Sequence, residues 1–371
     1  MRKLIILPLL ACLWQPLNAQ DTLLATYSRF DFVPGEKVIY AEDFASDATG
    51  ELPVNWNTNA NGSVIAMADK SKWLHLAVGN YLSGTKAKDF GPNFTVEFDM
   101  LLNVVPKMGY YLPPLTFGLF ASGKEDPGAN PFLTHQFQYN SFSVKIDPKE
   151  NENTMARIHS YENKKETFFG EKKVSKYGAT LRKVAHYAIS VQGTRLRIWI
   201  NEDKVFDLPR GVNTSTPFNQ LYFRVETTGG FPDEAFQYLV GNIKVAAGLP
   251  DTRSKLVTTG KFSTTGILFD VNSDKIKATS HGTLKEIAAV LTENPELKVK
   301  IVGHTDADGV PAANVALSKK RAEAVKTYLV EQFGIDATLL STDGKGASVP
   351  VGDNKTVLGK ANNRRVEFVK I

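Results

Sequence analysis

The chain has 371 residues, of which 42% are hydrophobic and 22% are charged, and its formal net charge is +5. At about 100–200 residues per domain, this length predicts two domains, each with its own core. The composition excludes a disordered chain. The small net charge, without a clustered basic stripe, argues against nucleic acid as a partner.

The first segment has the pattern of a secretory signal. Arg2 and Lys3 precede an apolar run from Leu4 to Trp14, and the small residue Ala19 follows. The run is shorter than the about 20 apolar residues that a membrane-spanning helix needs. We therefore predict a signal peptide over residues 1–19, which implies that the mature chain is exported.

The single cysteine, Cys12, lies inside this segment. A chain cleaved after Ala19 would therefore contain no disulfide, which suits a bacterial periplasm. The alternative is a lipoprotein box, Leu9–Cys12, with a lipid attached to the cysteine. The bulky Leu10 and the apolar residues that continue to Leu17 favour cleavage after Ala19.

Residues 36–248 have the pattern of an all-β domain. Phe94–Met100 alternates apolar and polar residues, the period of a half-buried strand. His186–Val191 and Leu196–Ile200 are two more predicted strands, joined by a tight turn. Many strands without helical periodicity predict a β-sandwich. Further strands are expected at Lys204–Leu208, Leu221–Glu226 and Tyr238–Val245.

The spacing of these strands, with Glu42-Asp43-Phe44 near the start and Gly241–Val245 at the end, resembles concanavalin-like (laminin-G-type) domains. The resemblance implies a jelly-roll sandwich over residues 36–248. Many such domains bind glycans, although the fold alone does not establish this. A transmembrane barrel is the alternative, with strands of about 9–11 residues. Several predicted strands here are shorter, which favours the sandwich.

Glu97 and Asp99 partly resemble the acids of some jelly-roll glycosidases, which need two carboxylates on one face about 5–5.5 Å apart. Because Met100–Leu102 stand where a third acid would follow, we expect the pair to lie on the solvated face of a strand. We therefore predict no enzymatic activity, with glycan hydrolysis as the alternative. Three tryptophans are candidates for stacking on sugars, although most tryptophans in sandwiches belong to the core: Trp56, Trp73 and Trp199.

Residues 249–261 combine Gly, Pro, Asp, Ser and Thr and predict a linker. Beyond it, over residues 262–371, strands and helices alternate. Lys277–Glu293 and Asn314–Phe333 are predicted helices, and Gly334 is positioned to end the second. The order β-α-β-α-β-β predicts an α+β domain. Its short strands are expected at Ile267–Phe269, Lys298–Gly303, Thr342–Lys345 and Val366–Ile371.

Acidic and basic residues occur across the loop that precedes the second helix. Asp306 and Asp308 lie in the loop, and Asn314, Leu317 and Arg321 share one face of the helix. A half-buried arginine needs a partner. One interpretation is a structural salt bridge between Asp306 and Arg321. The other is a cleft in which Asp306 accepts from an ammonium group and Arg321 clamps a carboxylate.

The motifs of this region resemble the OmpA-like peptidoglycan-binding domain over residues 262–371. They are Gly303-His304-Thr305-Asp306, Asn314, Leu317-Ser318, Arg321-Ala322 and Asn363-Arg364-Arg365-Val366-Glu367. The resemblance implies a β-α-β-α-β-β sandwich that binds diaminopimelate in the stem peptide of peptidoglycan. The binding residues implied by the resemblance are Asp306, Arg321, Asn314 and Arg364, with Thr305 and Leu317 beside them.

The resemblance thus implies a non-enzymatic protein of the periplasm, associated with the outer membrane, that holds its sandwich domain at the cell wall. A glycan or another envelope protein is the expected partner of the sandwich. No cofactor is predicted. His304 has no second histidine at metal spacing and is expected to be packed, and Asp306–Gly309 lacks the later acids of a calcium loop.

Overall fold

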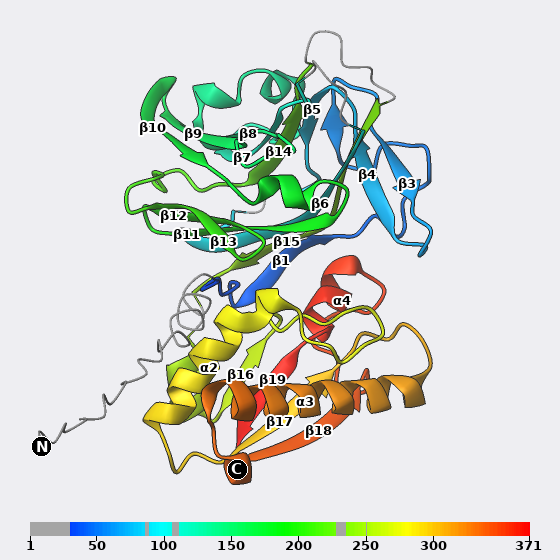
Figure 1. The fold of residues 1–371 in the computed structure, drawn as a ribbon, viewed down its shortest axis with the longest axis vertical. Helices are drawn as coiled ribbons and strands as arrows, with labels where there is room; N and C mark the ends of the chain where they lie inside the picture. The colour runs from blue at the N-terminus through cyan, green and yellow to red at the C-terminus, as the bar shows by residue number, and fades with distance from the viewer. Residues whose placement is uncertain (1–29, 86–88, 106–110, 228–234, 250) are drawn as a thin grey trace, which may run out of the picture.

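The computed structural model describes residues 30–85, 89–105, 111–227, 235–249 and 251–371, so the predicted signal peptide and Cys12 lie outside it. Figure 1 shows two bodies stacked along the long axis of the molecule. The N-terminal body is a sandwich of two antiparallel sheets, and the C-terminal body is a mixed α/β domain. This confirms the predicted fold class. No helix in the described part of the chain has the length and apolar character of a membrane crossing.

The first sheet of the sandwich has the strand order β13-β12-β11-β6-β15-β4-β3, and β1 also pairs with β15. Neighbouring strands run antiparallel. Its strands, within the described residues, are β1 (Lys37–Glu42), β3 (Ser63–Ala66), β4 (Lys72–Leu76), β6 (Asn93–Val104), β11 (Val184–Gln192), β12 (Arg195–Ile200), β13 (Asp203–Leu208) and β15 (Phe236–Ala247).

The second sheet has the order β10-β9-β8-β7-β14-β5-β2 and packs on the first. Its strands are β2 (Asn57–Thr58), β5 (Gly79–Leu82), β7 (Leu115–Ala121), β8 (Asn140–Asp147), β9 (Met155–Glu162), β10 (Lys165–Lys173) and β14 (Gln220–Val225). Short helical turns occur at η1 (Asn130–Leu133), η2 (Gln136–Gln138), η3 (Tyr177–Thr180), η5 (Ser254–Thr259), η6 (Ala278–Ser280) and η7 (Ala337–Leu339).

Strand β6 shows how the sequence builds the core of the sandwich. Phe94, Val96 and Phe98 point inward and are buried in the main apolar cluster. Because successive side chains of a strand point to opposite faces, Glu97 and Asp99 face outward from the same strand. That outer face is directed toward the C-terminal domain in Figure 1, and it is covered rather than solvated.

The C-terminal domain has a sheet of order β16-β19-β17-β18, in which only β17 and β18 are parallel. Helices α2 and α3 pack their apolar faces on this sheet, and their buried residues share one core with it. The elements are β16 (Lys261–Thr264), α2 (His281–Glu293), β17 (Val299–His304), α3 (Pro311–Phe333), β18 (Leu340–Gly346), α4 (Val357–Asn363) and β19 (Val366–Lys370).

In this region one prediction is wrong and one helix was missed. The strand predicted at Ile267–Phe269 is wrong, because Phe269 makes only an isolated bridge with Ile276 and the sheet begins with β16. Helix α4 was not predicted. Within residues 249–261, η5 is helical and buries Leu256 in the C-terminal core, and the domain boundaries stay a prediction. Helix α3 ends at Phe333. Gly334, which follows it, is in the left-handed conformation, as expected for a residue that ends a helix.

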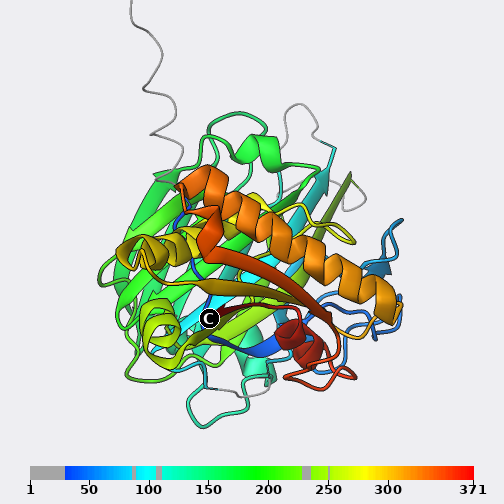
Figure 2. The same ribbon diagram turned by 90° about the horizontal axis from the view of Figure 1, so that it is seen from below.

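The two domains are in direct contact through residues 30–36. Phe32 packs edge-on against Trp199 of β12, with 5.3 Å between ring centroids. On the other side, a Cβ at Gly282 would meet the Phe32 carbonyl, and one at Gly266 would meet the Pro34 ring. The segment therefore fills the space between the sandwich and α2. Figure 2, from below, shows the C-terminal domain lying across the sandwich.

Candidate ligand-binding site

Hydrogen bonds to backbone carbonyls hold the loop between β17 and α3 in place. The Thr305 amide donates to the Gly346 carbonyl (3.0 Å), and the Thr305 hydroxyl donates to the Asp306 carbonyl (2.8 Å). Asn314, near the start of α3, donates through Nδ2 to the carbonyls of Asp308 (2.8 Å) and Asp306 (3.4 Å). Thr305 and Asn314 thus fix the loop that carries the two acids.

Glycines bring α3 close to the strands beneath it. A Cβ at Gly303 would meet the Ser318 carbonyl, and a Cβ at Gly344 would meet the Lys319 amide. These positions admit only glycine without a shift of the helix. The close approach places the side chains of α3 beside the end of β17, where Asp306 lies.

Asp306 is paired with Arg364, which follows α4. The Asp306 Oδ2 accepts a hydrogen bond from the Arg364 Nη1 at 2.6 Å. The Asp306 side chain is 13% exposed and that of Arg364 is 44% exposed. Of the two interpretations of Asp306 and Arg321, the one of a direct salt bridge is wrong, because among the described residues the ion-pair partner of Asp306 is Arg364.

Arg321 is half-buried and is oriented by two neighbours. Its Nε donates to the Ser273 carbonyl (2.9 Å), and its guanidinium lies 4.9 Å from the centre of the Phe269 ring. Burial lowers the pKa of Arg321, and the nearby Asp306 opposes this change. The terminal Nη groups make no hydrogen bond to any described residue, so they remain available as a carboxylate clamp.

The face of α3 predicted to carry the site is refined by the structure. Leu317 and Arg321 are half-buried and lie at the edge of the buried stripe rather than inside it. An edge position suits a residue that contacts both the core and a ligand. The buried stripe itself consists of Asn314, Ser318, Ala322, Val325 and Leu329.

A second charge pair at this site was missed by sequence reasoning. Lys360 of α4 lies 2.8 Å from one carboxylate oxygen of Asp308 and 2.9 Å from the other. Asp308 is the main cause of the raised pKa of Lys360.

Thr356, whose hydroxyl accepts from the Gly359 amide, is an N-cap signal that could have revealed α4. The loop therefore carries two acids, Asp306 and Asp308, and three cations lie around it: Arg321, Lys360 and Arg364.

Two asparagines, Asn363 and Asn354, link the end of α4 to the charged loop through hydrogen bonds. The fully buried Asn363 donates to the Asn354 Oδ1 (2.8 Å), and that oxygen accepts from the Ala307 amide (3.0 Å). Arg365, next in the chain, is buried and pairs with Glu367 at 2.8 Å. Of the two adjacent arginines, only Arg364 therefore faces the charged loop.

His304 is packed, as predicted. It is buried, its Nε2 lies 3.4 Å from the Glu367 carboxylate, and burial is the first cause of its lowered pKa. Nowhere in the described residues do three or more potential ligands gather as a metal site would require.

Glu97 and Asp99 are buried, so their predicted place on a solvated face is wrong. His186 of β11 lies between them, with its Nδ1 2.7 Å from the Asp99 Oδ1 and its Nε2 3.3 Å from the Glu97 Oε2. Lys244 lies 3.2 Å from Glu97, and Asn242 donates to Asp99 at 2.8 Å. Each acid already has two polar partners, which leaves no free carboxylate pair for a substrate.

The charges of this cluster shift its pKa values strongly. Burial opposes ionisation of Glu97, but Lys244 and His186 outweigh it and lower the pKa of Glu97 to about 2. Burial likewise opposes the charged imidazole, but the carboxylates of Asp99 and Glu97, which accept from it and attract its charge, raise the pKa of His186 to about 9. Glu97 and His186 are therefore both charged at neutral pH.

The tryptophans considered for sugar stacking belong to the interior. Trp56 stacks on Phe223 within the sandwich core, and Trp199 packs under Phe32 between the domains. The Trp73 ring covers Gly241, where a Cβ would meet it. All three side chains are buried, which leaves no ring face for a sugar.

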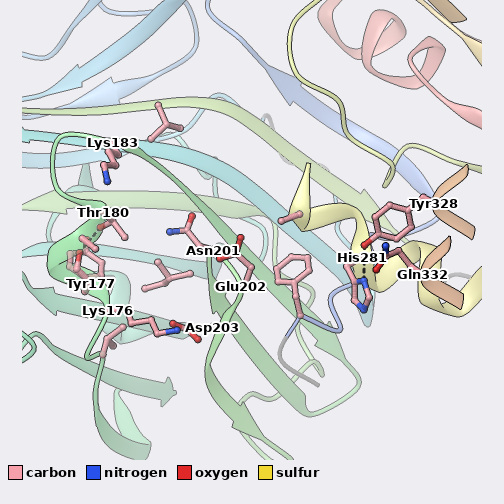
Figure 3. Close-up of a pocket in the computed structure, with 16 residues that line it drawn as sticks. Lys176, Tyr177, Thr180, Lys183, Asn201, Glu202, Asp203, His281, Tyr328 and Gln332 are labelled. Atoms are coloured by element: carbon pink, nitrogen blue, oxygen red, sulfur yellow. Dashed lines mark hydrogen bonds between the residues drawn. The ribbon is translucent and has the colours of Figure 1, made fainter. Parts of the chain in front are cut away.

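A cleft of about 650 Å³ lies between the domains, away from the charged loop. Figure 3 shows residues of the sandwich, such as Lys183 and Asn201, on one side and His281 and Tyr328 of the C-terminal helices on the other. No residue of the candidate site lines this cleft.

Comparison with known proteins identifies relatives of the C-terminal region. Residues 268–364 match the model of the OmpA family. Outer membrane porin F of Pseudomonas aeruginosa is 39% identical over 101 residues, which are 27% of this chain and 29% of that protein. The probable lipoprotein YiaD of Escherichia coli is 41% identical over 102 residues, 28% of this chain and 46% of that protein.

Among solved structures, the peptidoglycan-associated lipoprotein of Burkholderia pseudomallei is similar, with 29% identity, a TM-score of 0.27, and coverage of 29% of this chain and 89% of that one. The chain spans less than half the length of the two curated relatives above. The family match begins at residue 268. The concanavalin-like character of the sandwich stays a prediction.

Proposed function

Since residues 268–364 form an OmpA-family domain, we propose that this protein binds the diaminopimelate-containing stem peptide of peptidoglycan without catalysing a reaction. In this function the C-terminal domain grips the wall and holds the sandwich domain beside it. The names of the relatives, an outer membrane porin and a lipoprotein, support a place in the cell envelope at the periplasmic face of the outer membrane.

The observation that carries the proposal is the charge arrangement around residues 305–308. The free end of diaminopimelate bears an ammonium and a carboxylate on one carbon. Asp306 accepts from the ammonium, and the unengaged Nη groups of Arg321 clamp the carboxylate. Arg364 adds a second guanidinium to the carboxylate side.

Binding requires Arg364 to release Asp306 in part. The arginine side of the pair is 44% exposed, and the ligand ammonium takes its place, so the carboxylate of Asp306 is not left without a partner. The exchange of Arg364 for a ligand ammonium therefore costs little. Thr305 and Asn314 keep the loop in place during this exchange, and Leu317 offers an apolar contact at its edge.

The proposal is tested by sedimenting the purified protein with peptidoglycan sacculi. The double variant Asp306→Ala, Arg321→Ala should lose most of its sedimentation, because both charge contacts are removed. The matched control is Asp207→Ala, Arg195→Ala, which deletes a surface ion pair of 2.8 Å on the sandwich. Sedimentation of the first double variant at the wild-type level would rule out this site.

A glycan-binding role of the sandwich is the second candidate. Its support is Phe169 of β10, which is 52% exposed and lies with its ring 4.9 Å from that of His159, an arrangement open to sugar stacking. Glycan hydrolysis has less support, because Glu97 and Asp99 are buried and paired. Binding of peptide-free glycan chains that is lost in Phe169→Ala would favour the second candidate, and absence of such binding would count against it.

A further inference from the structure

Helix α4 connects the sandwich domain to the charged loop, although it is only seven residues long. Its residues divide between three directions. Leu358, Ala361 and Asn362 lie at i, i+3 and i+4 on one face, whereas Lys360 and Arg364 lie together on another. The third face, with Gly359 and Asn363, packs on the preceding loop.

The first face of α4 is seated on the sandwich. Ala361 packs in a small buried cluster with Val38 of β1 and Ala246 of β15, and Leu358 borders this cluster. The Asn362 Nδ2 donates to the Val38 carbonyl at 3.2 Å. The sandwich thus contacts the helix through both apolar packing and a backbone hydrogen bond.

The second face of α4 reaches the ligand-facing acids. Lys360 pairs with Asp308, and Arg364 pairs with Asp306. Asp43, directly after β1, also acts on Lys360, although Asp308 is the main cause of the raised pKa of that lysine. Both cations that α4 brings to the site therefore depend on where the helix sits against β1.

The third face of α4 packs closely on the loop before it. A Cβ at Gly359 would meet the backbone of Asp353, and Asn363 receives hydrogen bonds from the amides of Val351 (2.7 Å) and Gly352 (2.9 Å). A shift at the β1 contact is therefore transmitted to Lys360 and Arg364 rather than absorbed within α4.

We propose that the sandwich domain is a component of the stem-peptide site, in which β1 seats α4 so that Lys360 holds Asp308 and Arg364 lies beside Asp306, within reach of the ligand carboxylate. This inference rests on the proposed function. Val38, Ala361 and Asn362 are then positioning residues, which set the affinity for diaminopimelate without touching it. By linkage, the ligand strengthens the contact between the two domains.

The test uses the full chain and a purified muropeptide, an N-acetylmuramyl tripeptide ending in diaminopimelate, titrated by calorimetry. Val38→Ala should weaken binding about threefold or more, within the range for residues that transmit coupling. Asn362→Ala, which removes the hydrogen bonds of its Nδ2 to the carbonyls of Val38 and Leu358, should weaken binding in the same direction. Val38→Ile, which keeps a β-branched apolar side chain in the contact, should bind like the wild type.

The matched control is Val144→Ala, which removes the same atoms from the buried core of the second sheet, away from α4. This variant should be destabilised but should bind like the wild type. Equal affinities of Val38→Ala and Val144→Ala would overturn the inference.

A readout without ligand separates this inference from the proposed function. The nuclear magnetic resonance signals of the Lys360 Nζ and the Arg364 Nε should shift in Val38→Ala and stay in place in Val144→Ala. If the wild type does not bind the muropeptide, the proposed function fails, and these signals alone decide the role of β1. Unshifted signals in Val38→Ala would then contradict it.

Discussion

Position 321 requires an arginine, because Arg321 makes two contacts that a lysine cannot reproduce. Its Nε donates to the Ser273 carbonyl while its planar guanidinium lies over the Phe269 ring, so the terminal Nη groups are held in one direction. A lysine keeps the charge but offers a point donor on a flexible chain. We therefore predict that Arg321→Lys lowers muropeptide affinity about tenfold, a loss of about 1.4 kcal/mol, as measured by calorimetry.

The matched control for this substitution is Arg195→Lys, at a surface arginine that pairs with Asp207 through two hydrogen bonds. It changes a guanidinium in the same way but lies on the sandwich, so affinity should not change. Binding by Arg321→Lys that equals the wild type would mean that charge alone serves the ligand, and that the fork geometry plays no part.

The buried cluster of Glu97, Asp99, His186 and Lys244 makes stability depend on pH. The folded pKa of His186 is raised from 6.5 to about 9, so its stabilising effect is complete below pH 6.5 and is lost as the pH rises through 9. The folded pKa of Glu97 is lowered from 4.5 to about 2, so its effect is complete above pH 4.5 and is lost toward pH 2. The cluster stabilises most between these limits.

We therefore predict that the free energy of unfolding falls between pH 6.5 and 9.5 by on the order of 3 kcal/mol, since one pKa unit corresponds to about 1.4 kcal/mol. Urea denaturation at several pH values measures this fall. In His186→Gln the slope over this range should flatten, and the variant should be less stable at pH 6. An unchanged slope in that variant would assign the pH dependence to other groups.

At the scale of elements, strands and helices with a regular alternation of apolar and polar residues were predictable from the sequence. Short elements without such a pattern were not. The alternation in Phe94–Met100 predicts β6 because one side of the strand is buried in the sandwich core. Helix α4 has only seven residues, too few for a periodic signal, and its stability comes from the Thr356 cap and the contact with β1. Strand β16 exists because β19 pairs with it, which local sequence does not encode.

The candidate site was predictable in its residues but not in its pairing. The resemblance assigned Asp306, Arg321 and Arg364 to one site, and the structure brings them around one loop. Which arginine pairs with Asp306 depends on where α4 ends, and that helix was not predicted. The burial of Glu97 was missed because its partners, His186 of β11 and Lys244 of β15, come from neighbouring strands that are distant in sequence.

At the scale of the whole molecule, residues 30–36 join the two domains into one packed unit. Phe32 contacts Phe30 and Trp199 on the sandwich side, and its carbonyl lies where a side chain at Gly282 of α2 would be. Lys255 forms an ion pair with Glu36 across the same boundary. The sandwich is therefore held in a defined orientation to the C-terminal domain rather than on a loose tether.

Phe32 is the residue through which this packing can be tested. It is almost fully buried, and Phe→Ala substitutions at such positions cost about 3–5 kcal/mol. Because the lost contacts lie between the domains, we predict that Phe32→Ala lowers the thermal midpoint and separates one cooperative transition into two. Differential scanning calorimetry measures both effects.

The matched control is Phe169→Ala, which removes the same side chain from an exposed position on β10 and should cost less than about 1 kcal/mol. Its transition should remain single, because β10 lies at the edge of the second sheet and apart from α2 in Figure 1. If Phe32→Ala is destabilised yet still unfolds in one transition, segment 30–36 adds stability without coupling the domains, and the other contacts, at α4 and at Lys255, must then hold them together.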